Sequence, residues 1–378
     1  MSIRGGKTGR APTIAFASIG CKANREEMEC LLSRLEDAGY RVVPFGSAAD
    51  WTVVNTCTVT AEGESDSRQA ARRAARGKGG GRVVVTGCLA QRDPGGLAAL
   101  AGVDWVLGNA EKADLADWIL GAGRAPAGGA APAASGAMVE GASGAPVAEA
   151  AGAPERTPAG TPAPVTTEAG PDAAASGPGT PAGARIRVRR DPSIASFPAY
   201  GAGRDGRRAR ASLKVQDGCD ARCTYCVIPS VRGSSRSRPL DDCLRQARLL
   251  AASGYREIVL TGINTSLWGA DLDGSPELPD LVEALMSVEG LLRVRLNSLE
   301  PQAVRPDWLD RLAASPRLCR HYHLPLQSGS ARILRRMGRP YDPELYHRLV
   351  LAVRELLPDA AVGADVLVGF PGETEEDF

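Results

Sequence analysis

Three cysteines on one short segment have the residue type and the spacing to bind a metal cluster. Cys219, Cys223 and Cys226 follow the apolar run 213–215 with the spacing Cys-x3-Cys-x2-Cys. Three thiolates on one loop can bind three irons of a cubane iron-sulfur cluster and leave the fourth iron open to another ligand. A structural zinc site or cysteine cluster is the alternative, although zinc normally recruits a fourth protein ligand nearby.

Three more cysteines each come after a predicted strand. Short apolar runs predict strands at residues 13–18, 51–55 and 82–86. Each strand is followed within a few residues by one of Cys21, Cys57 and Cys88. In an open parallel sheet the carboxyl ends of the strands share one edge, and ligands bind outside that edge. We therefore expect a second cluster with an open iron here. The alternative is that each is an ordinary buried cysteine.

Two α/β domains are expected to position these cysteines. In residues 1–120 the strands alternate with helices such as 24–38, whose apolar residues share one face, which predicts an open parallel sheet. In residues 212–378 five strands alternate with helices, which predicts a partial parallel barrel of the (β/α)6 type. The first cysteine loop follows the first barrel strand, at the edge where barrel active sites lie. The barrel strands are expected at 213–216, 257–261, 293–297, 321–326 and 362–369, and the clearest helices at 241–253, 278–288 and 343–356.

The segment between these domains has a different composition. Residues 121–183 consist largely of Ala, Gly and Pro with almost no large apolar side chains, which predicts a disordered linker. Residues 184–211 follow as an arginine-rich basic connector. The net charge of +1 excludes little, but the clustered basic residues are compatible with RNA contact.

The remaining sequence points to a cytoplasmic protein. No apolar stretch approaches the length of a membrane span, and residues 1–12 have no hydrophobic core of a secretory signal. In a reducing compartment, nine cysteines serve as cluster ligands and buried thiols rather than as disulfides. Cys30, Cys243 and Cys319 have no partners by spacing and are not expected to be ligands.

The first cysteine motif, with Tyr225 before its last cysteine, resembles the signature of the radical S-adenosylmethionine (SAM) superfamily. With Cys21, Cys57 and Cys88 ahead of it, the order of motifs is similar to that of the methylthiotransferase family within this superfamily. The resemblance implies two 4Fe-4S clusters and two molecules of SAM. One SAM methylates a sulfur, and the other is cleaved to a 5′-deoxyadenosyl radical that removes hydrogen from the substrate carbon.

The residues after Cys57 indicate a branch of this family. The run 58–60 (Thr-Val-Thr) and the later 67–69 (Ser-Arg-Gln) resemble the branch that modifies C2 of N6-threonylcarbamoyladenosine, next to the anticodon of transfer RNA. The branches that act on isopentenyladenosine or on a ribosomal protein stay open as alternatives. So does a noncatalytic iron-sulfur or tRNA-binding protein. The resemblance implies a tRNA substrate, an electron donor such as flavodoxin or ferredoxin, and no membrane or DNA partner.

The family resemblance also implies a SAM pocket at the strand ends of the second domain. Tyr225 is expected near the adenine, and Gly262 where the backbone approaches the SAM ammonium. The other expected pocket residues are Asn264, Ser298, Glu300, His323 and Gln327. Family members continue with a sixth barrel unit and a small RNA-binding TRAM domain. Because this chain ends at Phe378, the resemblance implies a chain truncated at its carboxyl end.

Overall fold

The structure is a computed structural model that describes residues 10–122, 184–192, 197, 203 and 208–378. All of these residues belong to one compact unit. The disordered linker expected at residues 121–183 lies outside the described residues from position 123 onward. Its first two positions, 121 and 122, form the end of a helix.

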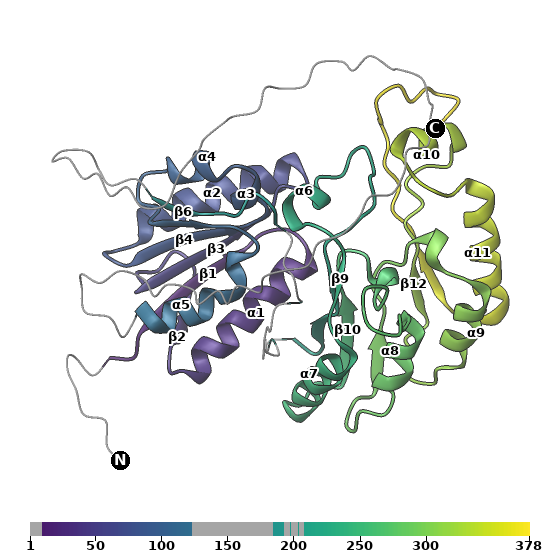
Figure 1. Ribbon diagram of the computed structural model, residues 1–378, viewed down its shortest axis with the longest axis horizontal. Helices are drawn as coiled ribbons and strands as arrows, with labels where there is room; N and C mark the ends of the chain where they lie inside the picture. The colour runs from purple at the N-terminus through teal and green to yellow at the C-terminus, as the bar shows by residue number, and fades with distance from the viewer. Residues whose placement is uncertain (1–9, 123–183, 193–196, 198–202, 204–207) are drawn as a thin grey trace, which may run out of the picture. The chain divides into compact units, whose positions relative to one another are not determined.

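The first sheet has six parallel strands in the order β2-β1-β3-β4-β5-β6 (Figure 1). Its strands are β1 (Thr13–Ser18), β2 (Arg41–Val43), β3 (Trp51–Thr56), β4 (Arg82–Gly87), β5 (Trp105–Leu107) and β6 (Arg185–Arg187). The connecting helices are α1 (Lys22–Asp37), α2 (Ala61–Gly77), α3 (Cys88–Arg92), α4 (Pro94–Ala98) and α5 (Leu115–Ala122), with a 3-10 turn at Glu111–Asp114. This is the parallel α/β sheet expected from the sequence.

Helices cover both faces of this sheet because successive strand residues point to opposite sides. Val53 of β3 packs with α1 and α5 on one face, whereas its neighbour Val54 packs with α2, α3 and α4 on the other. Both valines are fully buried. Each face therefore has its own apolar core, and the sheet is a rigid platform for the loops at its carboxyl edge.

Three short strands of this sheet were not predicted from the sequence. The strands β2, β5 and β6 have three residues each, too few for a hydrophobic alternation to stand out. The strand β6 lies in the segment expected to be a basic connector, and all three of its residues are exposed at the sheet edge. Arg185 lies over the ring of Trp105, with its guanidinium carbon 5.0 Å from the ring centroid.

The second part of the chain contains a three-stranded parallel sheet and two separate strand pairs. Its strands are β7 (Ala211–Lys214), β8 (Gln216–Asp217), β9 (Arg236–Ser237), β10 (Glu257–Thr261), β11 (Arg293–Arg295), β12 (His321–His323) and β13 (Ala361–Gly363). The helices are α6 (Ile228–Arg232), α7 (Leu240–Ala252), α8 (Leu278–Leu285), α9 (Pro306–Ala314), α10 (Ala331–Met337) and α11 (Pro343–Leu356), with 3-10 turns at Thr265–Leu267 and Pro301–Ala303.

The expected succession of strand-helix units is confirmed. β10 pairs in parallel with β7 and β11, and β12 pairs in parallel with β13. Single parallel bridges join Val294 to Leu318 and Ser298 to His323, so the strand succession continues from β11 to β12. One large apolar core lies between these strands and α7, α8, α9 and α11, and it includes Cys243, which is fully buried.

The antiparallel pair β8-β9 was not predicted. It brackets residues 218–235, so the two ends of the cysteine segment are held together by the pairing of Gln216 with Ser237 and of Asp217 with Arg236. Among the described helices, none has the length and apolar character needed to cross a membrane.

Candidate functional site

The first thiol set, which consists of Cys21, Cys57 and Cys88, lies at the point where the first sheet reverses its strand order. Along the chain β1 is followed by α1, which covers one face, and β3 is followed by α2, which covers the other. Cys21 precedes α1 as its N-cap, Cys57 follows β3, and Cys88 begins α3. Burial raises the pKa of Cys57, and the neighbouring Cys88 and Cys21 thiols raise it further. Strand pairing aligns Ser18 with Asn55 and Thr56 with Gly87, so the three cysteines that follow lie at the same carboxyl edge of the sheet. Such a reversal point is where open α/β sheets bind ligands.

Two glycines make this convergence possible. Gly20, before Cys21, has a φ of 94°, and a Cβ there would lie 2.6 Å from the Cys57 Sγ atom. Gly87, before Cys88, has a φ of 99°, and a Cβ would lie 2.5 Å from the Thr56 carbonyl oxygen. Only glycine tolerates both the left-handed conformation and the close approach.

Replacing either glycine should therefore disturb the first thiol set. We expect Gly20→Ala and Gly87→Ala to lose about half of the iron bound on anaerobic reconstitution, because one of two four-iron clusters would be lost. Gly95→Ala is the matched control, because a Cβ there meets nothing within 4 Å. Iron analysis of the three purified variants provides the measurement. Full iron binding by both Gly20→Ala and Gly87→Ala would contradict this reading of the loop geometry.

The second thiol set, which consists of Cys219, Cys223 and Cys226, lies on the loop between β8 and β9. The Cys219 N–H donates to the Gly233 carbonyl at 3.0 Å, and the Cys226 N–H donates to the Cys223 carbonyl at 3.0 Å. The loop is also fixed from α10, because the Thr224 N–H donates to the Met337 carbonyl at 3.0 Å. These bonds hold a segment without regular structure in one conformation.

The electrostatics of this loop show that its thiols lie near one another. Burial raises the pKa of Cys219, and Cys226 and Cys223 add to that rise. Burial also raises the pKa of Cys226, again with a contribution from Cys223. All three cysteines are partly exposed, and iron binds the deprotonated form of such groups.

Arg339 is a site residue that the sequence did not reveal. Its guanidinium donates to the Cys223 Sγ atom at 3.2 Å and to a Glu300 carboxylate oxygen at 2.6 Å. Burial works against its charge, but the Glu300 carboxylate raises the pKa of Arg339. Arg339 follows α10 and is 116 positions from Cys223, so no local motif connects the two residues.

The expected SAM-pocket residues fall into three groups. Gly262 and Asn264 follow β10, and the Asn264 N–H donates to the Gln216 Oε1 atom at 2.7 Å. Ser298 Oγ and His323 Nδ1 are hydrogen-bonded at 2.8 Å. Gln327 has a φ of 66°, which is rare for a residue with a side chain. The Asn264 Oδ1 atom is buried and has no hydrogen-bond partner among the described residues.

The donor type of both thiol sets suits a cubane iron-sulfur cluster, because each set supplies three soft sulfur ligands. Within the described residues, no three His, Cys, Asp or Glu side chains are arranged around one metal position. In a cubane each thiolate binds a different iron, so the three sulfurs are spread over separate corners. Each set supplies three soft ligands on loops held by backbone hydrogen bonds.

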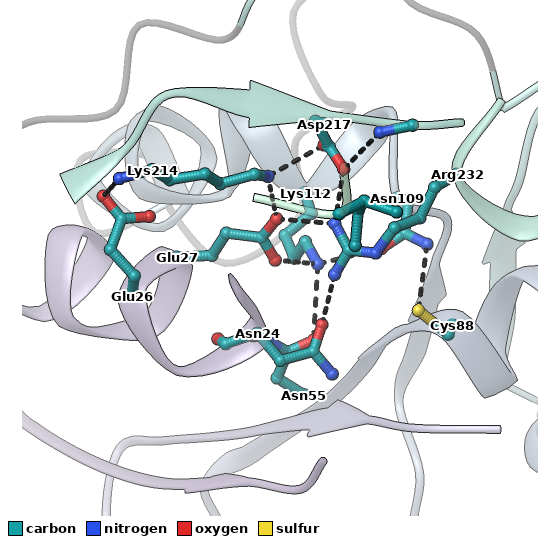
Figure 2. A network of polar contacts seen from close by, with 12 residues as sticks. Asn24, Glu26, Glu27, Asn55, Cys88, Asn109, Lys112, Lys214, Asp217 and Arg232 are labelled. Carbon is teal, nitrogen blue, oxygen red and sulfur yellow. Dashed lines mark hydrogen bonds and ion pairs between the residues drawn. The ribbon is translucent and has the colours of Figure 1, made fainter. Parts of the chain in front are cut away.

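A buried polar network joins the first sheet domain to the second part of the chain (Figure 2). Glu27 of α1 forms ion pairs with Lys112 at 2.5 Å, with Arg232 at 3.0 Å and with Lys214. Asp217 of β8 pairs with Lys214 at 2.8 Å and with Arg232 at 2.9 Å. All five side chains are at most 4% exposed. Burial opposes the charge of Glu27, but Arg232, Lys112 and Lys214 lower its pKa.

A cleft of about 430 Å³ is lined by residues that adjoin one cysteine of each thiol set. Its lining residues are Thr58, Val59, Thr60, Ala61, Glu64, Arg92, Tyr225 and Val227. Thr58 is next to Cys57, whereas Tyr225 and Val227 flank Cys226. A group bound in this cleft would therefore be close to the loops of both thiol sets. Its polar residues are linked, because Arg92 donates to the Thr58 Oγ1 atom at 2.9 Å and to Glu64 at 3.2 Å.

Two family models match this chain. Residues 213–378 match the radical SAM superfamily, and residues 13–108 match a family described as uncharacterized protein family UPF0004. The threonylcarbamoyladenosine tRNA methylthiotransferase MtaB of Bacillus subtilis is 35% identical over 97% of this chain and 69% of its own length. The ribosomal protein uS12 methylthiotransferase RimO of Desulforudis audaxviator is also 35% identical, over 97% of this chain and 70% of its own length.

A solved structure supports the fold. The radical SAM methyltransferase TsrM from Kitasatospora setae, with cobalamin and a 4Fe-4S cluster bound, is similar with a TM-score of 0.60. The match covers 97% of this chain and 71% of the other, at 19% identity. This similarity concerns the fold and confirms the α/β arrangement expected from the sequence.

The fold and the matches define a radical SAM enzyme, a class that uses a 4Fe-4S cluster and SAM. Within this class, the chain belongs to the methylthiotransferase family. The class and the family expected from the cysteine motifs are therefore confirmed. The matched relatives include enzymes with tRNA and with ribosomal-protein substrates at equal identity, so the substrate has to be argued from the site.

Proposed function

We propose that this enzyme adds a methylthio group to C2 of N6-threonylcarbamoyladenosine next to the anticodon of tRNA, using two 4Fe-4S clusters and two SAM molecules. Cys219, Cys223 and Cys226 hold the cluster that cleaves SAM, in the domain formed by residues 212–378. Cys21, Cys57 and Cys88 hold the second cluster, in the domain of residues 1–120. A tRNA substrate places the reaction in the cytoplasm, with flavodoxin or ferredoxin as electron donor.

The cleft lined by residues that adjoin one cysteine of each thiol set is the observation that carries this proposal. Its two sides are the segment that follows Cys57 and the residues that flank Cys226. The reacting carbon must receive a sulfur group from one site and lose hydrogen at the other, so a substrate has to reach both. Cluster and SAM supply radical chemistry for an inert carbon-hydrogen bond, and the protein holds the partners in register.

The lining of the cleft favours threonylcarbamoyladenosine over the isopentenyl nucleoside. The threonylcarbamoyl group carries a carboxylate, a hydroxyl and a urea, all of which form hydrogen bonds. Arg92 is a cation on the cleft wall with an exposed side chain, and Thr58 and Thr60 supply hydroxyls. An isopentenyl group has no polar atoms and would add no hydrogen bond to these side chains.

The size of the cleft favours the nucleoside over an aspartyl side chain of a ribosomal protein. An aspartate would also offer a carboxylate to Arg92. However, about 430 Å³ lies in the range of pockets for drug-sized ligands, much larger than one carboxymethyl group. The cleft therefore fits an extended substituent with several polar groups.

The SAM pocket is proposed at the strand ends of the second domain. Tyr225 is exposed and adjacent to Cys226 in the chain, and the pair formed by Glu300 and Arg339 lies against Cys223. Gly262, Asn264, Ser298, His323 and Gln327 complete the set. The buried Asn264 Oδ1 atom without a partner among the described residues suits a donor group on a ligand.

Nucleoside analysis of tRNA tests the substrate. Mass spectrometry of tRNA from a strain that lacks the gene should show N6-threonylcarbamoyladenosine without its methylthio derivative. A plasmid copy of the gene should restore the derivative. Persistence of this derivative, together with loss of methylthioaspartate from the ribosomal protein, would replace the tRNA substrate with the protein substrate.

Arg92 should determine the affinity for the modified nucleoside. We expect Arg92→Gln to lower kcat/KM for threonylcarbamoylated tRNA roughly tenfold or more, because a charge-assisted hydrogen bond contributes about 1.5–3 kcal/mol. Arg72→Gln, at an exposed position of α2, controls for the loss of a positive charge near RNA. Dissociation constants for tRNA with unmodified adenosine should be equal for both variants. If Arg92→Gln and Arg72→Gln lose the same factor in kcat/KM with the modified tRNA, Arg92 acts only as a general cation.

A further inference from the structure

Arg232 connects the two thiol sets across the chain. It is the last residue of α6, which begins two positions after Cys226, and its guanidinium forms a 2.9 Å ion pair with Asp217, two positions before Cys219. Nevertheless it also approaches the other thiol set. Its guanidinium donates to the Asn24 Oδ1 atom at 2.5 Å, and the Asn24 amide donates to the Thr56 carbonyl oxygen, next to Cys57, at 2.9 Å.

The Arg232 side chain is held rigidly and is not fully satisfied. It is 1% exposed, and it donates to Glu27 at 3.0 Å and to Asn24 at 2.5 Å. Its Nε atom is buried and has no hydrogen-bond partner among the described residues. One donor nitrogen of this rigidly held guanidinium is therefore left over.

A second cation approaches the same thiols from the first sheet domain. Lys112 is buried, with 3% of its surface exposed. The Lys112 Nζ atom donates to the Asn109 Oδ1 atom at 2.8 Å, while the Asn109 amide donates to the Cys88 Sγ atom at 3.7 Å (Figure 2). Cys88 therefore has a buried cation and an amide donor on one side.

We propose that Arg232 and Lys112 are the fixed positive charges that set the reduction potential of the cluster bound by Cys21, Cys57 and Cys88. This rests on the proposed function, because it takes those cysteines as cluster ligands. A cluster gains one negative charge when it accepts an electron. A buried positive charge nearby stabilises that charge, since the low dielectric screens it little. The cations therefore make reduction of this cluster easier.

The consequence is a coupling between the two halves of the reaction. Arg232 comes from the segment that carries the SAM-cleaving cluster, yet it tunes the cluster on the other domain. The cluster bound by Cys21, Cys57 and Cys88 therefore reaches its reduction potential only when α6 is in place beside the first sheet. Arg232 and Lys112 would thus act through their charge on the cluster and not on the substrate.

A redox titration tests this assignment without any turnover. The full chain carrying Cys219→Ala, Cys223→Ala and Cys226→Ala retains only the cluster of the first domain, so one signal can be followed by electron paramagnetic resonance. In that background we compare Arg232→Met, Arg232→Lys, Lys112→Met and the control Arg236→Met. Arg236 belongs to the same network through a 2.7 Å ion pair with Asp217.

At a fixed ambient potential, Arg232→Met and Lys112→Met should each lower the ratio of reduced to oxidised cluster about tenfold, which is a 59 mV shift for one electron. Arg232→Lys keeps the charge and should remain close to the parent, as should Arg236→Met. If Arg232→Met does not fold, Lys112→Met gives the same reading. The assignment would be overturned if Arg232→Met and Lys112→Met, where they fold, keep the reduction potential of the parent. It would also be overturned if Arg236→Met shifts the potential as much as they do. Absence of any cluster in the parent background would instead refute the proposed function.

Discussion

Replacing Cys219, Cys223 and Cys226 together with alanine should reduce the formation of 5′-deoxyadenosine from SAM to the rate without enzyme. These three thiols are the proposed cluster ligands on the loop of the radical SAM domain, and SAM would have no cluster to bind without them. The measurement is chromatography of an anaerobic reaction with dithionite and SAM.

The matched control is the triple alanine variant at Cys21, Cys57 and Cys88, which leaves the loop of residues 219–226 unchanged. This control should still cleave SAM while forming no methylthio product, because it loses only the cluster bound by Cys21, Cys57 and Cys88. Cleavage by the first variant at the parent rate would mean that the radical originates elsewhere, and the assignment of the two sites would be wrong.

Removing one acid from the buried network should cost most of the stability of an ordinary domain. We expect Glu27→Gln or Asp217→Asn to lower the free energy of unfolding by about 3–5 kcal/mol, because cations of the network are then left buried without their partner. Asp359→Asn is the control. Asp359 pairs with Arg320 on the surface, where its side chain is 68% exposed, so the change should be about 1 kcal/mol or less. Urea denaturation monitored by circular dichroism measures all three.

The pH dependence of stability follows from the same two acids. The network cations lower the pKa of Glu27 and Asp217 in the folded chain, although burial opposes this. Their contribution is complete above about pH 4, the range in which these carboxyls titrate in an unfolded chain. It is lost as the pH falls from there toward the folded values. Below about pH 4, stability should therefore fall more steeply in the parent than in Glu27→Gln. Equal slopes would show that Glu27 is not ionised in the fold.

The cysteine motifs could be recognised in the sequence because their signals are local. Cys219, Cys223 and Cys226 share one short segment, and Cys21 and Cys57 each follow a strand long enough to be recognised. The regular order of strands and helices was sufficient to predict that parallel strand ends would meet at one edge.

The residues that support these sites could not be predicted, because they join distant parts of the chain. Arg232 and Glu27 are 205 positions apart, and Arg339 and Cys223 are 116 apart. A single arginine carries no periodicity and belongs to no motif until the fold places it next to a partner. The same reason applies to β6, whose three exposed residues resemble a charged linker in the sequence.

Mössbauer spectroscopy of anaerobically reconstituted protein tests the central claim, that one chain holds two separate cubanes with three thiolates each. The parent should bind about eight irons in two 4Fe-4S clusters, and each triple cysteine variant about four. Addition of SAM should change the spectrum of one iron in the cluster of Cys219, Cys223 and Cys226. A parent with about four irons, or two triple variants that lose the same cluster, would contradict the account.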